Sequence, residues 1–131
     1  MSMKEDKYVS WDLKQLGISF CLNEGRITLF KTTIKVLGNP EFYRFLFSPE
    51  DRLFAVQACE INDKGANRVR LELKSDNHIK SMALVRLVYH SCRWKENVTY
   101  RVPGIGYPTD QAVQFDLAAA YEIHEGKVTE S

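Results

Sequence analysis

The segment Ile18-Ser-Phe-Cys-Leu-Asn-Glu-Gly-Arg-Ile-Thr-Leu-Phe30 carries the clearest structural signal in the chain. Its two ends, 18–22 and 26–30, are rich in the β-branched, aliphatic and aromatic side chains that favour strands. The three residues between them end with Gly25, and glycine readily adopts the positive φ that a short connection requires. The segment therefore predicts a β-hairpin and makes an antiparallel sheet the first hypothesis for the fold.

A second predicted hairpin joins residues 42–47 to residues 53–59 through the turn Ser48-Pro-Glu-Asp-Arg52. Within 42–47, both sets of alternating positions are largely apolar. Because successive side chains of a strand point to opposite faces, this composition indicates a strand that is covered on both sides. We therefore expect 42–47 to lie in the centre of the sheet.

Three further strands are predicted by alternation of apolar and polar residues, at 69–73, 98–102 and 113–117. Between the last two, the stretch 103–111 contains two glycines and two prolines, a composition typical of turns. We expect this turn to join those two strands as a hairpin.

Two helices are predicted. Residues 31–37 are followed by Gly38 and Pro40, which together form a common helix stop. The longer helix runs from 78 to 93, where most side chains are apolar. Its candidate N-caps are Ser75, Asp76 and Asn77.

Together these elements predict a single α+β domain over residues 1–131, with a mainly antiparallel sheet of about six or seven strands, one long helix and one short helix. Residues 1–16 form a polar lead-in, and 125–131 form a frayed tail. A helix followed by a hairpin occurs at 31–59 and again at 78–117, which suggests two helix-plus-hairpin repeats. The alternative is a chance match, because few residues coincide between the two units.

Composition favours a cytoplasmic protein. The three cysteines are odd in number and widely spaced, so they form neither a disulfide framework nor a zinc motif. The first residues lack the apolar core of a secretory signal, and no apolar run reaches the roughly 18 residues that span a membrane. We therefore expect buried free thiols, a cytoplasmic location and no membrane partner.

Patterns for catalysis, metal binding or cofactor binding are weak. On the predicted helix, His90 and Cys92 point about 200° away from each other, so they cannot form a nucleophile–base pair. The histidines and cysteines lack metal-ligand spacing, and Gly104-Ile-Gly106 precedes no helix that could hold a phosphate. We predict no catalytic, metal or cofactor residues and favour a non-enzymatic protein. An enzyme whose site is assembled from distant residues is the alternative.

Charge is unevenly distributed, although the net charge is only +1. Residues 64–101 hold 9 basic and 3 acidic residues, whereas 102–131 hold 1 basic and 5 acidic residues. At 100° per residue, Arg86, His90 and Arg93 fall within about 60° of one another on the predicted helix. They form a narrow basic strip on an otherwise largely apolar helix.

The basic residues of this region predict contact with anions. Guanidinium groups suit phosphate oxygens, and aromatic rings can stack on unpaired bases. The predicted contact residues are Arg68, Arg70, Lys80, Arg86, His90, Arg93 and Arg101, with Trp94 and Tyr100 as stacking rings.

Three interpretations of the basic strip follow. The leading hypothesis is a binding protein that contacts nucleic acid through residues 64–101. The competing one is a protein-interaction or assembly module whose basic strip meets an acidic partner. In the third, the strip is the solvated edge of a buried helix, neutralised by the acidic C-terminal residues within the fold or across a dimer.

The chain also resembles a group of small uncharacterised bacterial proteins for which no function is established, over about residues 25–123. The segments that carry the resemblance are Leu37-Gly-Asn-Pro40, Phe45-Leu-Phe-Ser-Pro-Glu50, Tyr100-Arg-Val-Pro-Gly104 and Phe115-Asp-Leu117. These are turn and core residues, so the resemblance implies no activity.

Abundant apolar strands in a short chain leave a sheet edge or face that needs cover, which favours a homodimer.

Overall fold

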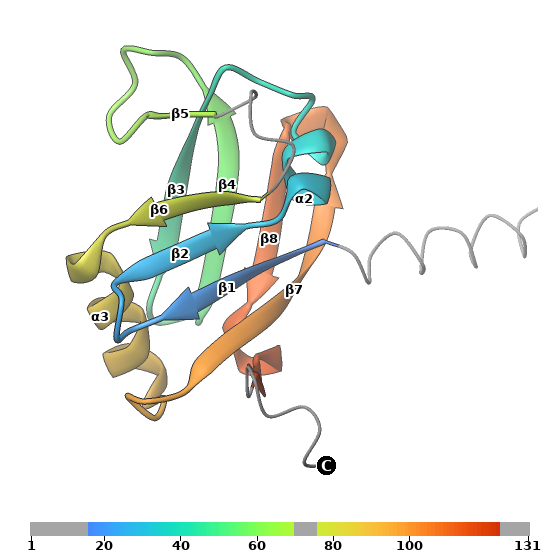
Figure 1. Ribbon diagram of the computed structural model, residues 1–131. Coiled ribbons are helices and arrows are strands. Elements are labelled where there is room, and N and C mark those ends of the chain that lie inside the picture. Colours follow the sequence, from blue (N-terminus) through green and yellow to red (C-terminus); the bar gives the residue numbers. More distant parts are fainter. Residues whose placement is uncertain (1–15, 70–75, 124–131) are drawn as a thin grey trace, which may run out of the picture.

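The computed structural model describes residues 16–69 and 76–123 (Figure 1). The strands are β1 (Gly17–Cys21), β2 (Arg26–Leu29), β3 (Phe42–Ser48), β4 (Leu53–Cys59), β5 (Asn67–Arg68), β6 (Asn77–Lys80), β7 (Thr99–Tyr107), β8 (Ala112–Asp116) and β9 (Tyr121–Ile123). The helices are α2 (Lys31–Val36) and α3 (Met82–Cys92), with short 3-10 turns η1 (Pro108–Asp110) and η2 (Leu117–Ala119). Most of the predicted strand at 69–73, Arg70, nearly all of the lead-in and the tail lie outside the described residues.

The strands form one antiparallel sheet in the order β5-β3-β4-β8-β7-β1-β2-β6, and β9 also pairs with β7. The sheet curls into a half-barrel, so that β1, β2 and β6 cross in front of β3 and β4 (Figure 1). The long strand β7 connects the two halves, because its first part pairs with β1 and its last part pairs with β8. The concave side of this sheet holds the core.

The core is built mainly from aromatic and β-branched side chains that point inward from the strands. Phe20, Phe54 and Phe115 are fully buried, and the rings of Phe20 and Phe54 meet edge-to-face at 5.2 Å. Helix α3 packs against β2 and contributes Val85, Val88 and Tyr89 to the core, while α2 packs against β7 and β8. None of the helices in the described ranges is long and apolar enough to cross a membrane.

The coarse fold prediction is confirmed: the protein is mainly an antiparallel sheet with one long and one short helix. The first two predicted hairpins are present, as β1–β2 and β3–β4. The third is present as β7–β8, but residues 104–107 of β7 pair with β8 in place of the predicted 98–102. The predicted strand number was too low, since nine strands pair in the described residues. The predicted repeat is not found, because α2 packs against the strands of the later hairpin, whereas α3 packs against β2.

The long helix begins four residues later than predicted. Residues 77–80 form β6, with Ile79 opposite Ile27 of β2, and the backbone N–H of Ser81 donates to the Gly25 carbonyl at 2.8 Å. Ser81 therefore takes the N-cap position, although its side chain makes no capping hydrogen bond. Residues 77–80 hydrogen-bond to the edge of β2, which satisfies their backbone N–H groups. In the first turn of a helix these N–H groups would have had no partner.

The predicted turn at 103–111 is mostly strand, because β7 continues to Tyr107. A Cβ on Gly104 would lie 2.7 Å from a methyl group of Val113, and one on Gly106 would lie 2.8 Å from a methyl group of Val36. These glycines therefore allow close packing within a strand, which local turn statistics do not distinguish from a loop.

Strand β3 is not covered on both faces. It lies second from one end of the sheet and pairs with β5 over only two residues. Tyr43 is buried, Phe45 and Phe47 are half-buried against the core, and Leu46 on the opposite face is 45% exposed. The apolar residues of this outward face are surface residues in a single chain.

Candidate functional site

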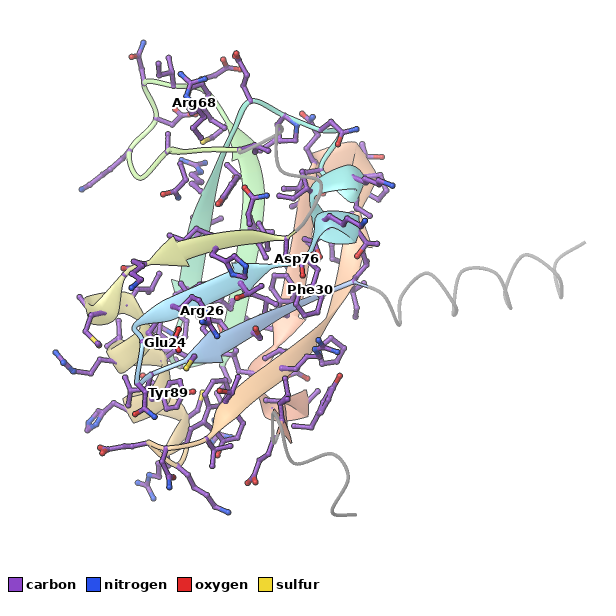
Figure 2. All side chains as sticks on the ribbon, viewed as in Figure 1. Glu24, Arg26, Phe30, Arg68, Asp76 and Tyr89 are labelled. Atoms are coloured by element: carbon purple, nitrogen blue, oxygen red, sulfur yellow. The ribbon has the colours of Figure 1, made fainter. Side chains whose placement is uncertain are left out.

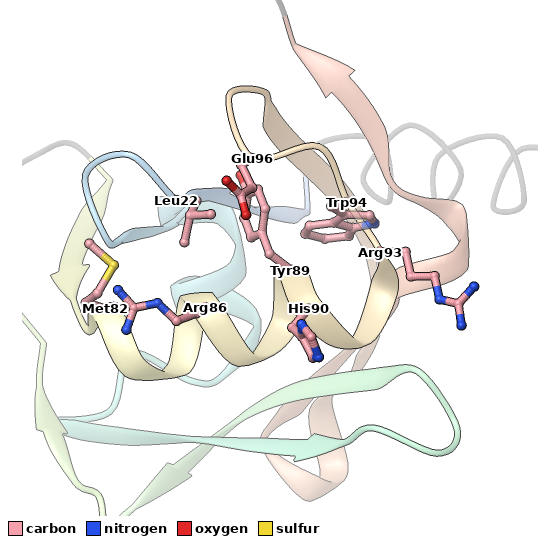
Figure 3. Close-up of a pocket in the computed structure, with 8 residues that line it drawn as sticks. All are labelled: Leu22, Met82, Arg86, Tyr89, His90, Arg93, Trp94 and Glu96. Carbon is pink, nitrogen blue, oxygen red and sulfur yellow. The ribbon is translucent and has the colours of Figure 1, made fainter.

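A groove of about 650 Å³ lies beside α3 (Figure 3). We call it the α3 groove. Eight residues from β1–β2, α3 and the loop that follows α3 line it: Leu22, Met82, Arg86, Tyr89, His90, Arg93, Trp94 and Glu96.

The apolar part of the groove is held in place by hydrogen bonds and ring contacts. The hydroxyl of the buried Tyr89 lies 2.8 Å from the Phe20 carbonyl and 2.6 Å from the Val98 carbonyl. The Trp94 ring stacks on Tyr100 at 4.3 Å and meets Tyr89 edge-on at 5.2 Å. These contacts fix α3 to β1 and to the start of β7, so the groove has a preformed wall.

Two arginines and one histidine also line the groove. Arg86, His90 and Arg93 are exposed and lie four and then three residues apart on α3. In the part of the chain that the structure describes, none of the three forms an ion pair or side-chain hydrogen bond. Figure 3 shows Arg93 extending away from the helix, and Glu96 lines the groove as its acidic residue. The groove thus combines unpaired positive charge with a single acid.

The backbone of Arg93 determines where Trp94 lies. Arg93 ends α3 in the left-handed conformation, with φ 56° and ψ 42°. Its N–H donates to the His90 carbonyl, and the N–H of Trp94 donates to the Tyr89 carbonyl at 3.0 Å. This pattern closes the helix and turns Trp94 back over it, a role that glycine usually performs.

The other predicted contact residues lie on different surfaces. The Arg68 guanidinium sits 4.7 Å from the centre of the Phe42 ring, and that of Arg101 sits 4.5 Å from the centre of the Phe30 ring. Figure 2 shows Arg68 and Tyr89 at opposite ends of the molecule. The basic region of the sequence therefore does not form one continuous surface in the described residues.

The predicted anion contact Lys80 and the predicted stacking ring Tyr100 lie outside the α3 groove lining. Lys80 lines a second groove, of about 400 Å³, together with Arg68 and His78, between β6 and the β3–β5 edge. Tyr100 is buried, its ring is stacked on Trp94, and its hydroxyl accepts a hydrogen bond from the Lys95 N–H. Tyr100 therefore has no open ring face for a base.

Sequence reasoning missed Leu22, Met82, Tyr89 and Glu96 as groove residues. A signal for two of them was present, because Met82, Arg86, Tyr89 and Arg93 are spaced by four, three and four residues and share one side of a helix. Leu22 could not be found in this way. It reaches the groove only because the β1–β2 turn packs beside the start of α3.

The thiols and acids of the described residues do not form a reactive or metal-binding group. Burial raises the pKa of Cys92 and of Cys59 above the usual range, which disfavours the nucleophilic thiolate. Within the described ranges, no three His, Cys, Asp or Glu side chains cluster as metal ligands. What the α3 groove can do chemically is bind anions and apolar groups.

Comparisons with protein-family models, with curated proteins and with solved structures found no match to this chain. The proposals below therefore depend on the geometry alone.

Proposed function

We propose that this chain is a non-enzymatic binding protein whose α3 groove holds an acidic segment of a partner protein. The observation that carries this proposal is the set of three exposed, unpaired side chains, Arg86, His90 and Arg93, beside an apolar wall of Tyr89 and Trp94. Arginine, tyrosine and tryptophan are the residues that most often dominate the binding energy of protein interfaces.

Exposed apolar side chains next to the cations favour a protein partner. Met82 lines the groove with Arg86 and is 40% exposed, and Trp94 lines it as a half-buried ring. A partner segment with carboxylates and an apolar side chain would cover both kinds of group. Arg86 and Arg93 are about 10 Å apart along the helix axis, so they can engage two acids that flank one apolar anchor.

Nucleic acid is the second candidate, and the spacing of the cations is what favours it. Arg86 and Arg93 can each engage a phosphate group of a single strand. However, the stacked Trp94 has one ring face occupied by Tyr100, and Arg68 and Arg101 contact other surfaces. Such a complex would rely on few phosphate contacts and little base stacking.

Trp94 fluorescence tests the proposal directly. In a Trp11→Phe variant, Trp94 is the single tryptophan and reports on the groove. We expect a library of acidic peptides, each with one apolar residue, to contain members that change this fluorescence, whereas their Glu→Gln counterparts do not. Arg86→Ala and Arg93→Ala should each weaken the binding about tenfold, or about 1.4 kcal/mol.

Arg101→Ala is the matched control, because it removes an exposed arginine outside the groove. Its peptide affinity should equal that of the parent. Equal losses in all three arginine variants would indicate a diffuse charge effect and contradict the groove assignment. Binding of mixed-sequence RNA that falls steeply with salt, in the absence of peptide binding, would favour the nucleic-acid candidate instead.

A further inference from the structure

The outward side of β3, β4, β8 and β7 forms a continuous surface, which we call the outer face. The strand register places Leu46, Ala55, Gln114 and Ile105 in one row across the four strands. The inward residues of the same strands, such as Phe54 and Phe115, are buried in the core. The outer face is thus the reverse side of a sheet whose inner side is already packed.

This face is more apolar than a solvated sheet surface. Leu46 is 45% exposed, Ile105 is 53% exposed and Tyr107 is 41% exposed. Antiparallel sheets that face water on one side normally alternate apolar inward and polar outward residues. Where the four strands pair with one another, the charged outward side chains are one base, Arg44, and one acid, Asp116. A further outward base, Arg101, lies on the earlier part of β7, which pairs with β1.

The helices of the described residues do not cover the outer face. A Cβ on the inward-facing Gly106 would meet Val36 of α2, so α2 lies on the inner side of the sheet. Helix α3 packs against β2, in the other half of the sheet.

We propose that the outer face is the interface between two copies of this chain, packed as a two-fold sandwich of sheets. Four strands span about 19 Å at the usual spacing. We estimate roughly 700 Å² of accessible surface per copy, near the roughly 800 Å² per partner of a stable interface. Where the four strands pair with one another, each copy carries one base and one acid, so these parts of the two faces meet without net repulsion.

Side-chain sizes on this face suit packing of a sheet against its own copy. Ala55 is small and lies beside Leu46 in the central row, with Ile105 at the far side of that row. Large and small residues that alternate across facing layers can interdigitate. The proposal is independent of the α3 groove.

Sedimentation velocity over a hundredfold range of protein concentration tests this interface. The wild-type chain should dissociate from dimer to monomer on dilution. Leu46→Lys and Ile105→Lys should each raise the dimer dissociation constant at least tenfold, and the double variant should be monomeric throughout. Far-UV circular dichroism should be unchanged, because both side chains are exposed in the single chain.

The matched control is Ile61→Lys, which introduces the same charge at a side chain that is 60% exposed in the loop between β4 and β5. The control should dimerise like wild type. A wild-type chain that is monomeric at every concentration would overturn the proposal, as would variants that dissociate no more readily than Ile61→Lys.

Discussion

The hydroxyl of Thr33 exchanges two hydrogen bonds with the backbone of Gly17. It accepts from the Gly17 N–H and donates to the Gly17 carbonyl, each at 3.1 Å, and both residues are buried. A side chain of α2 therefore acts as an additional pairing partner for the first residue of β1. This contact ties the short helix to the sheet, which six residues of helix would not achieve by their own propensity.

Replacing the Thr33 hydroxyl should destabilise the fold. In Thr33→Val the shape is kept, but the buried N–H of Gly17 loses its hydrogen-bond acceptor. We expect the free energy of unfolding to fall by about 2–3 kcal/mol, as measured by urea denaturation. Thr33→Ser keeps the hydroxyl and should lose less. A serine variant that is less stable than the valine variant would contradict this account.

The Tyr89 hydroxyl affects stability in two ways, through its contacts with the Phe20 and Val98 carbonyls and through its raised pKa. Burial raises the pKa of Tyr89 well above its ordinary value of 10.0, so the folded state holds the neutral form. The free energy of unfolding therefore keeps its full value below pH 10, the pKa of tyrosine in the unfolded chain. It falls as the pH rises further, by about 1.4 kcal/mol per pH unit.

The Tyr89→Phe variant separates these two effects. At neutral pH its free energy of unfolding should be about 1–2 kcal/mol lower than that of wild type, because the Phe20 and Val98 carbonyls lose their contact with the hydroxyl. Above pH 10 the difference should shrink, since only the wild type has this alkaline loss. A constant difference between the two proteins from pH 7 to about pH 11 would refute the assignment.

Substitutions at Arg93 should separate stability from binding. Arg93→Gly removes the Cβ from a left-handed position, and we expect a gain of about 0.5–1 kcal/mol in thermal or urea denaturation. Arg93→Ala keeps the strained backbone and should show no such gain. Both variants lack the cation and should bind acidic peptides equally poorly. Unequal peptide binding would mean that the guanidinium is not the decisive group.

Gly104→Ala should strain the packing of β7 on β8. The new methyl group would lie 2.7 Å from Val113 and 2.8 Å from Phe115, which must both move. We expect a loss of about 1–3 kcal/mol. Adding Val113→Ala should make the double variant more stable than the sum of the two single losses predicts, because the second change removes one clashing side chain. Strict additivity would show that the site adapts by another route.

Local patterns in the sequence predicted the elements whose cause is local. The hairpin around Gly25 and the helix stop at Gly38 depend on backbone preferences of a few residues, and both were confirmed. The basic spacing on α3 was also visible in the sequence, although the partner of that strip stays a prediction.

The errors arose where a distant segment decided the outcome. Residues 77–80 form a strand because β2 offers them an edge, and residues 103–107 remain extended because Val113 and Val36 pack against their glycines. The inward and outward faces of 42–47 look alike in sequence, but only one of them meets a core.

The amino-acid sequence by itself determined the antiparallel hairpins, the two helices and the placement of two arginines and a histidine on one side of α3, since these follow from period, turn chemistry and spacing. Only the tertiary structure decided that Leu22 and Trp94 join those side chains in a groove, that Arg68 and Arg101 lie elsewhere, and that one sheet face is left apolar and open. The physical reason is that burial and proximity depend on which surfaces pack together. That choice is made by the sum of many long-range contacts and is not written in any single segment.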